Sequence, residues 1–287
     1  MKINWLILEI FNALCLYALA FSLHGAAPFR RGFFCSDESL RYPSKSPEIV
    51  SYAGLLVISL LVPVVVVILV EFSLSVRSTN GSVDKLPKAV HNILTVLCEW
   101  FTVFSLSMLL VAFTKIMVGR LRPMFFEACN PDVDCGDAKN LHRYITDFKC
   151  TNENRSLTSL GKSFPSGHAS ESMVSMMYLV FYFHKRFAEM PAIRGVILIL
   201  QISCVIIALF VGLSRIQDYH HHWSDVMAGF IFGAFIAVAG GQTSGKLNRL
   251  LPYNKPSRTP AELVGNSVTR SFEKSTKPIE VSINSTR

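Results

Sequence analysis

The chain has 287 residues, of which 51% are hydrophobic and only 17% are charged, whereas about 25% of the residues of soluble proteins are charged. The apolar residues are gathered in long runs and the mean hydropathy is +0.38, which excludes a soluble globular protein. The net charge of +8 does not form a basic stripe interleaved with aromatic residues, so no nucleic-acid partner is expected. A membrane surface or a phosphate group fits this charge better.

Six segments are long and apolar enough to cross a bilayer, whose core requires about 20 helical residues. The fourth is the weakest because its first turn is polar, and that turn must face protein or water rather than lipid. The first is longer than the apolar core of a signal peptide, which favours a retained span over cleavage after Gly25-Ala26-Ala27. We therefore predict an all-α polytopic membrane protein with a bundle of six transmembrane helices. The segments cover residues 5–23, 50–70, 93–114, 168–183, 193–213 and 224–241.

Six spans place both chain ends on one side of the membrane and three connections on the other. Lysine and arginine are divided almost evenly between the two sides, so charge does not fix the orientation. The side with the three connections also carries a sequon at Asn154, the expected glycosylation site, and four cysteines. An even set on one face indicates two disulfides in an oxidising space, with three pairings open. These cysteines are Cys35, Cys129, Cys135 and Cys150.

The cysteines indicate cytosolic termini and extracellular or lumenal connections. Residues 1–244 are expected to form the six-span domain. Residues 245–287 are rich in serine, threonine, proline and lysine with little apolar periodicity, which predicts a disordered cytosolic tail.

Three polar clusters interrupt the apolar chain. Residues 115–123 follow the third span, residues 164–168 open the fourth, and residues 214–225 join the fifth to the sixth. The alternation of the spans puts all three clusters at the same membrane face. They can therefore converge on one site, although about a hundred residues separate the first from the last.

The residue types in these clusters fit phosphoryl transfer. Lys115, Arg122 and Arg215 supply three cations, and arginine is suited to bidentate binding of phosphate oxygens. Ser166 and Gly167 stand where a helix begins, so we expect their backbone N–H groups and the helix dipole to point at an anion.

Two histidines, His168 and His221, complete the clusters, and Asp225 follows the second by four residues. Residues four apart share a helix face, so we predict that Asp225 accepts a hydrogen bond from His221. That bond fixes the tautomer and leaves the other ring nitrogen as a nucleophile.

The residues alone leave alternatives open. A single lysine after a span is typical of an interfacial anchor, and a run of histidines is typical of a solvated or zinc-binding patch. No further ligand at zinc spacing lies in the same loop. Asp218 and His222 are also four apart, and Arg120 lies as close to the clusters as Arg122.

The three clusters resemble the type 2 phosphatidic acid phosphatase superfamily. Its pattern of Lys-(six residues)-Arg-Pro, Pro-Ser-Gly-His and Ser-Arg-(five residues)-His-(three residues)-Asp is complete at residues 115–123, 165–168 and 214–225. A wider similarity to the animal lipid phosphate phosphatases covers most of residues 28–240. Three motifs in the right order with the right spacing make the resemblance very specific.

The resemblance implies the role of each site residue. His221 attacks phosphorus to form a phosphohistidine, and Asp225 orients it. His168 protonates the departing lipid hydroxyl and then serves as the base for water. No metal or other cofactor is expected, because fixed cations offset the phosphate charge. The residues implied to hold the phosphate are Lys115, Arg122, Ser166, Gly167 and Arg215.

The family's usual substrates are phosphatidate, lysophosphatidate, sphingosine 1-phosphate and ceramide 1-phosphate, which belong to phospholipid metabolism and lipid signalling. Two alternatives remain: a non-catalytic relative that binds lipid phosphate, and a phosphatase of another ester, such as a sugar phosphate or polyprenyl diphosphate. A vanadium haloperoxidase shares the anion pocket, but such proteins are largely soluble. We expect the plasma membrane; internal membranes and a homo-oligomer stay open.

Overall fold

The computed structural model describes residues 2–77, 85–152 and 157–243. The predicted glycosylation site at Asn154 and the predicted tail over residues 245–287 lie outside these ranges.

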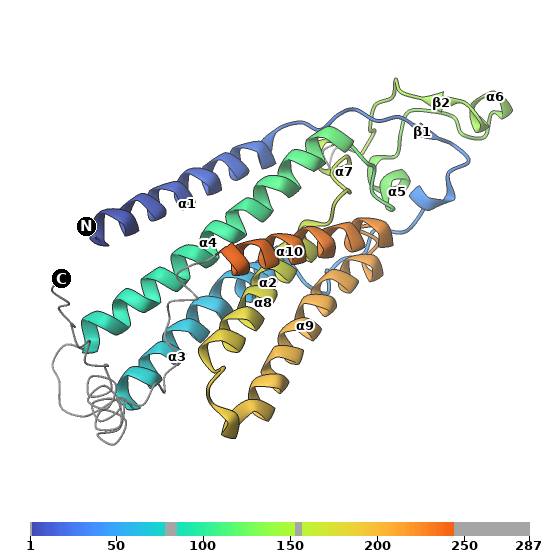
Figure 1. The fold of residues 1–287 in the computed structure, drawn as a ribbon. Coiled ribbons are helices and arrows are strands. Elements are labelled where there is room, and N and C mark those ends of the chain that lie inside the picture. The colour runs from blue at the N-terminus through green and yellow to red at the C-terminus, as the bar shows by residue number, and fades with distance from the viewer. Residues whose placement is uncertain (1, 78–84, 153–156, 244–287) are drawn as a thin grey trace, which may run out of the picture.

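Long helices with roughly parallel axes dominate the described residues (Figure 1). The second long helical segment, the α2–α3 rod, consists of α2, a π-helical segment η2 (Val57–Leu61) and α3 in continuous succession. The bounds of the long helices are α1 (Lys2–Gly25), α2 (Tyr52–Leu56), α3 (Val62–Arg77), α4 (Lys85–Val118), α8 (Gly167–Arg186), α9 (Arg194–Gln217) and α10 (Trp223–Thr243).

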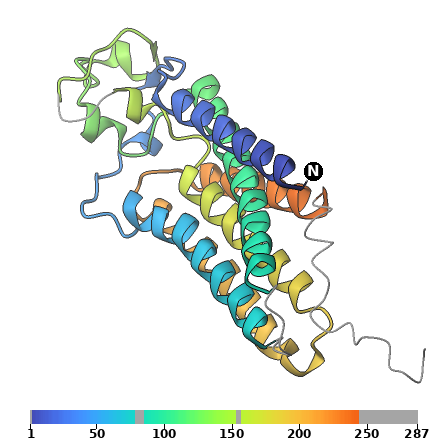
Figure 2. The ribbon, with the colours of Figure 1, turned by 90° about the vertical axis from the view of Figure 1, so that its left-hand side faces the viewer.

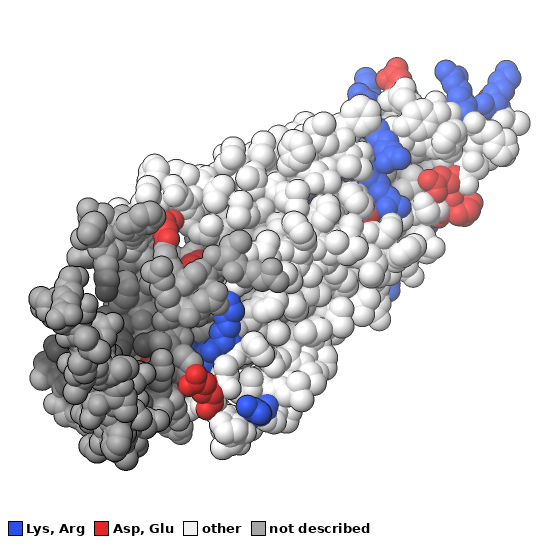
Figure 3. Space-filling view, in the orientation of Figure 1, with Lys and Arg blue, Asp and Glu red and all other residues white. Residues whose placement is uncertain are grey.

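Five helical segments are long and apolar enough to cross a membrane. They correspond to every predicted span except the fourth. On the face drawn in Figure 3, a broad belt without charged side chains separates the charged groups near the two ends of the molecule. The prediction of an all-α polytopic membrane protein is confirmed.

Helix α8, the weakest predicted span, is packed against α4, α9 and α10. In its polar first turns Ser170, Glu171 and Ser172 are buried, so these groups face protein rather than lipid, as a polar turn within a bilayer requires. Because its neighbours shield it, α8 needs less apolar surface than a helix in contact with lipid.

Two glycines allow α8 and α10 to approach closely. A Cβ atom at Gly229 would lie 2.5 Å from the carbonyl oxygen of Ser166, and one at Gly233 would lie 2.4 Å from that of Ser170. Small residues serve this purpose in membrane helix pairs. The contact fixes the beginning of α8 against the beginning of α10, where two of the three polar clusters lie.

The smaller elements gather at one end of the bundle, which we call the loop end, except for η3 (Pro191–Ile193) between α8 and α9 (Figures 1 and 2). The loop end contains an antiparallel pair in which Phe33 lies opposite Ile145. Its elements are β1 (Phe33–Phe34), η1 (Glu38–Leu40), α5 (Phe125–Cys129), α6 (Ala138–Leu141), β2 (Tyr144–Ile145) and α7 (Leu157–Leu160).

Two disulfides and an aromatic cluster hold the loop end together. Of the three pairings that the sequence leaves open, the structure contains Cys35–Cys135 and Cys129–Cys150. The buried ring of Phe33 packs against Phe125 and Phe148. The first disulfide joins positions 100 residues apart, so it ties the connection after α1 to the connection after α4.

Candidate active site

The three polar clusters meet at the loop end around a cavity of about 210 Å³. Of the predicted site residues, Arg122, His168, Arg215 and His221 line it, one or more from each cluster. Glu48 lines it as well, although no sequence motif contains that residue. Span counting therefore predicted the convergence correctly.

Arg215, in the last turn of α9, is buried and held by two carboxylates. Its Nη1 donates to Glu48 Oε2 (2.8 Å) and its Nη2 to Asp218 Oδ2 (2.7 Å). Its Nε donates to Ser214 Oγ at 3.1 Å. These bonds fix the plane of the guanidinium beside the cavity.

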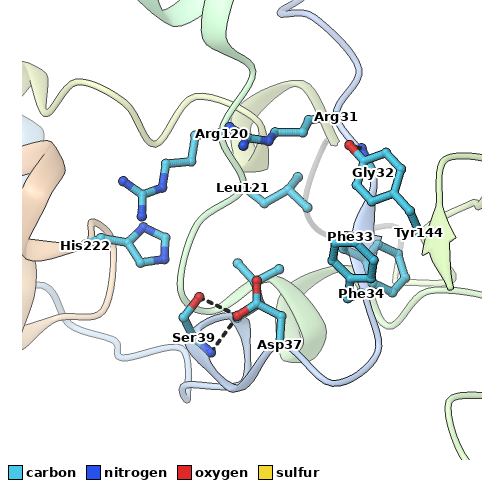
Figure 4. Close-up of a pocket in the computed structure, with 11 residues that line it drawn as sticks. Arg31, Gly32, Phe33, Phe34, Asp37, Ser39, Arg120, Leu121, Tyr144 and His222 are labelled. Atoms are coloured by element: carbon cyan, nitrogen blue, oxygen red, sulfur yellow. Dashed lines mark hydrogen bonds between the residues drawn. The ribbon is translucent and has the colours of Figure 1, made fainter. Parts of the chain in front are cut away.

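Arg120 and Arg122 point to different places. Arg122 borders the cavity, and its Nε donates to the carbonyl oxygen of Ser159 at 3.1 Å. Arg120 instead donates from Nη1 to Asp225 Oδ1 at 2.6 Å and to Ser224 Oγ at 2.8 Å. It lines a separate pocket, in which it lies near His222 (Figure 4). Of these two arginines, Arg122 is therefore the one beside the histidines of the cavity.

The predicted pairing of His221 with Asp225 is present as a contact longer than a hydrogen bond. His221 Nδ1 lies 3.9 Å from Asp225 Oδ2, and it donates instead to the carbonyl oxygen of Ser163 at 2.6 Å. The reason is local: α10 begins at Trp223, so His221 stands in the turn before the helix and helical spacing does not apply. Because a carbonyl can only accept, the proton lies on Nδ1 and Nε2 keeps its lone pair.

Asp225 is fully buried and collects donors from several directions. Its Oδ2 accepts from Ser163 Oγ at 2.6 Å and from the backbone N–H of His222 at 3.0 Å, while Arg120 bonds its Oδ1. Ser163 also links the two residues, because its hydroxyl donates to Asp225 and its carbonyl oxygen accepts from His221. Sequence reasoning missed Ser163, because nothing distinguishes a serine just before the second motif.

The surroundings of His221 favour its neutral form. Burial holds the pKa of His221 well below its usual value of 6.5, and the positive charges of Arg122 and Lys115 lower this pKa further, against the opposing effect of Asp225. A buried imidazole among cations gains a proton with difficulty. At neutral pH, Nε2 is therefore an available nucleophile.

His168 stands in the first turn of α8, on the same cavity. Its Nε2 is buried and has no hydrogen-bond partner among the described residues. A buried ring nitrogen without a partner in the protein is suited to hydrogen bonding with an oxygen of a bound ligand.

Lys115 and Ser166 lie beside the cavity rather than on its lining. Lys115, near the end of α4, is buried and donates from Nζ to the carbonyl oxygen of Lys162 at 2.7 Å. A Cβ atom on Gly167 would lie 3.9 Å from Lys115 Cε, so the lysine stands behind the beginning of α8.

The predicted role of the Ser166 backbone N–H was wrong. This group donates to the carbonyl oxygen of Asp225 at 2.9 Å and is not directed at an anion. The Ser166 hydroxyl instead caps α8 by accepting from the N–H of Ala169, which is the usual function of a serine at this position.

The fold and the cavity together define a class: a multi-pass helical membrane protein with a cationic, histidine-bearing cavity at one end of its bundle. Comparison with known proteins agrees. Residues 96–249, more than half of the chain, match the PAP2 superfamily. The chain belongs to this superfamily, and its relatives there are phospholipid phosphatases, as the motifs predicted.

Three relatives illustrate the similarity. A putative phosphatidate phosphatase of Drosophila melanogaster is 34% identical over 235 residues, which cover 74% of this chain and 60% of that protein. Phospholipid phosphatase 1 of Rattus norvegicus is 34% identical over 74% of each chain. Phospholipid phosphatase 2 of Homo sapiens is 33% identical over 74% of this chain and 72% of its own. No solved structure matches the chain.

Proposed function

We propose that this chain is an integral membrane lipid phosphate phosphatase that hydrolyses phosphate monoesters of lipids. The observation that carries the proposal is the meeting of Arg122, Arg215, His168 and His221 on one cavity. The relatives that cover three quarters of the chain are named phosphatidate or phospholipid phosphatases, which supports the same activity here.

In the first step, His221 Nε2 attacks phosphorus while the carbonyl oxygen of Ser163 holds the Nδ1 proton. A phosphorus–nitrogen bond forms and the bond from phosphorus to the lipid oxygen breaks. His168, which takes up a proton when the anionic phosphate binds beside its unpartnered Nε2, gives that proton to the lipid oxygen. The products are the lipid alcohol and a phosphohistidine.

In the second step, neutral His168 takes a proton from a water molecule, whose oxygen attacks the phosphohistidine. Phosphate leaves and His221 recovers its lone pair. Arg122 and Arg215 offset the charge that develops on the phosphoryl oxygens, and Lys115 adds a positive charge from behind Gly167. Asp225 keeps the Ser163 segment, and through it the imidazole, in place.

The mouth of the cavity suits a substrate embedded in lipid. Tyr52 lines the cavity, is 56% exposed and begins the α2–α3 rod. A phosphate in the cavity therefore leaves its alkyl chains beside a membrane-spanning segment. The substrates proposed are phosphatidate, lysophosphatidate, sphingosine 1-phosphate and ceramide 1-phosphate.

The loop end is proposed to face the extracellular space, with the termini in the cytosol and the protein in the plasma membrane. The two disulfides support this orientation, because such bonds persist in oxidising compartments. Asn154 is then expected to carry a glycan in an animal cell, while Asn80 and Asn284 are not. Mass spectrometry of glycopeptides tests this orientation, and a glycan on Asn80 would contradict it.

Phosphate release by the purified protein tests the activity. The four lipid phosphates, a sugar phosphate and a polyprenyl diphosphate are compared in detergent micelles with EDTA present, and His221→Ala serves as the inactive control. We expect release from the lipid monoesters, with inhibition by vanadate. Release from the sugar phosphate or the diphosphate alone would assign another ester. Binding of lipid phosphate without any release would indicate a non-catalytic relative.

A further inference from the structure

A carboxylate lines the cationic cavity and contacts no reacting atom in the mechanism above. Glu48 Oε2 bonds Arg215 Nη1 at 2.8 Å, and Glu48 Oε1 lies 3.1 Å from His220 Nε2. Among the described residues that line the cavity, Glu48 is the one acidic side chain. A negative charge next to a phosphate raises the energy of the bound state. Because Asp218 also holds Arg215, the fixing of that guanidinium does not by itself explain a carboxylate at this position.

The segment around Glu48 is anchored to the last residue of α9 and to the residue that follows it. Lys45 Nζ donates to the carbonyl oxygen of Gln217 at 2.8 Å, and the N–H of Ile49 donates to Asp218 Oδ2 at 3.0 Å. The chain is thus fastened on both sides of Glu48, which directs its carboxylate at the cavity.

Glu48 stands at the mouth of the cavity rather than on its floor. The side chain is 33% exposed, whereas Arg215 is 1% and His221 4% exposed. Tyr52, which also lines the cavity, is more than half exposed. A lipid whose phosphorus faces His221 has its first carbon atoms near this mouth, because its chain must leave the buried floor toward the membrane.

We propose that Glu48 determines specificity by binding an ammonium group on the carbon next to the one that bears the phosphate ester. The substrate class is the phosphates of long-chain amino alcohols, such as sphingosine 1-phosphate. Arg215 bonds Glu48 directly. A phosphate that binds the same guanidinium is therefore separated from the Glu48 carboxylate by about the width of that group. An ammonium close to the phosphate fits that spacing, and a charge-assisted bond to it offsets the repulsion between carboxylate and phosphate.

A second reading makes a different prediction. If Glu48 merely occupied Arg215 until any phosphate displaced it, removal of the charge would increase kcat/KM for every phosphate ester by the same factor. Recognition of an ammonium changes the ratio between substrates that do and do not carry one. The ratio therefore distinguishes the two readings.

The inference rests on the proposed phosphatase activity, and the experiment separates the two. The kcat/KM values of wild type and Glu48→Gln are measured at pH 7 in identical mixed micelles. The substrates are sphingosine 1-phosphate and its analogue with a hydroxyl in place of the amine. We expect the preference for the amine to fall about tenfold in Glu48→Gln, as for one lost bond to a charged group at a partly exposed site. Both values come from one preparation, so the folded fraction cancels from their ratio.

Glu38→Gln is the matched control, because Glu38 lies on η1, is largely exposed and does not line the cavity; its ratio is expected to stay unchanged. Glu48→Asp, which keeps the charge, is expected to retain part of the preference. A ratio within twofold of wild type in Glu48→Gln, or an equal rise for both substrates, overturns the assignment of Glu48. If wild type hydrolyses neither of these two substrates but does hydrolyse phosphatidate, the assignment of Glu48 fails and the proposed function stands; if it hydrolyses no lipid phosphate, the proposed function itself fails.

Discussion

Helix α8 buries charge at both of its ends, and the two ends are built differently. At its C-terminal end, Arg186 forms two hydrogen bonds to Glu71 of α3, at 2.8 and 3.0 Å, and Tyr182 donates to the same carboxylate at 2.9 Å. All three side chains are buried. This end is a closed pair, in which the charges match and the carboxylate oxygens have partners.

The N-terminal end of α8 is open. Arg122 and Arg215 line a cavity there, Lys115 lies beside it, and a buried nitrogen of His168 has no partner among the described residues. Charges taken out of water are costly unless they are matched. The closed pair does not line this cavity and is suited to hold helices together. The open end presents Arg122, Arg215 and the unpartnered His168 Nε2 to the cavity, which suits an anionic ligand.

At the open end, loss of the nucleophile is expected to reduce activity more than any other substitution proposed here. His221→Ala is expected to lower phosphate release by about 10⁴-fold or more and to abolish trapping of radiolabelled phosphate on the protein. His222→Ala is the matched control. This neighbour points at Asp225 instead of the main cavity, so much of the activity should remain. Labelled phosphate found on His222 would contradict the assignment.

His168→Ala is expected to impair hydrolysis to a degree that depends on whether the leaving group needs a proton. With a lipid alcohol, loss of the general acid lowers kcat by about 10²–10⁴-fold. With p-nitrophenyl phosphate, whose leaving group needs no proton, the first step should be less impaired, and phosphohistidine should accumulate because the base is also gone. Rapid-quench kinetics with both substrates measures this. An equal defect in the first step for the two leaving groups would remove His168 from the role of acid.

Disruption of the closed pair is expected to lower the stability of the protein rather than its catalytic activity. Glu71→Ala leaves Arg186 buried without its carboxylate, which costs about 3–5 kcal/mol of folding free energy. We expect a lower thermal unfolding midpoint and a lower yield, with kcat/KM per folded molecule within twofold of wild type. Glu38→Gln, at an exposed position, controls for the loss of one negative charge. A selective loss of activity at unchanged stability would show that the two ends are coupled.

The sequence predicted the open end better than the closed one. Arg122, His168, Arg215 and His221 were found because alternating spans bring distant motifs to one face. Glu71 and Arg186 could not be paired in advance, because the register of two spans against each other depends on their packing.

Within the site, the errors and omissions are equally physical. The contact between His221 and Asp225 is longer than predicted because the chain turns just before α10 begins. The contribution of Glu48 depends on a connection docking onto a distant loop, and Ser163 acts through its backbone carbonyl, which any residue carries. Patterns along the chain report spacing and alternation, and neither fixes such tertiary contacts.

The smallest expected effect is a dependence on pH that is weaker than an ordinary histidine gives. The reaction requires neutral His221. Burial and two nearby cations lower its pKa, so the neutral form persists as the pH falls below 6.5. For an unperturbed histidine, the neutral fraction at pH 5.5 would be about tenfold smaller than at high pH.

We expect kcat/KM for p-nitrophenyl phosphate at pH 5.5 to stay within about twofold of its value at pH 7, once the ionisation of the substrate is divided out. Measurement in His168→Ala removes the titration of the general acid. A tenfold fall with a midpoint near pH 6.5 in that variant would mean that His221 titrates as if in water. The burial and the positive charges at the open end of α8 would then have no effect on the nucleophile.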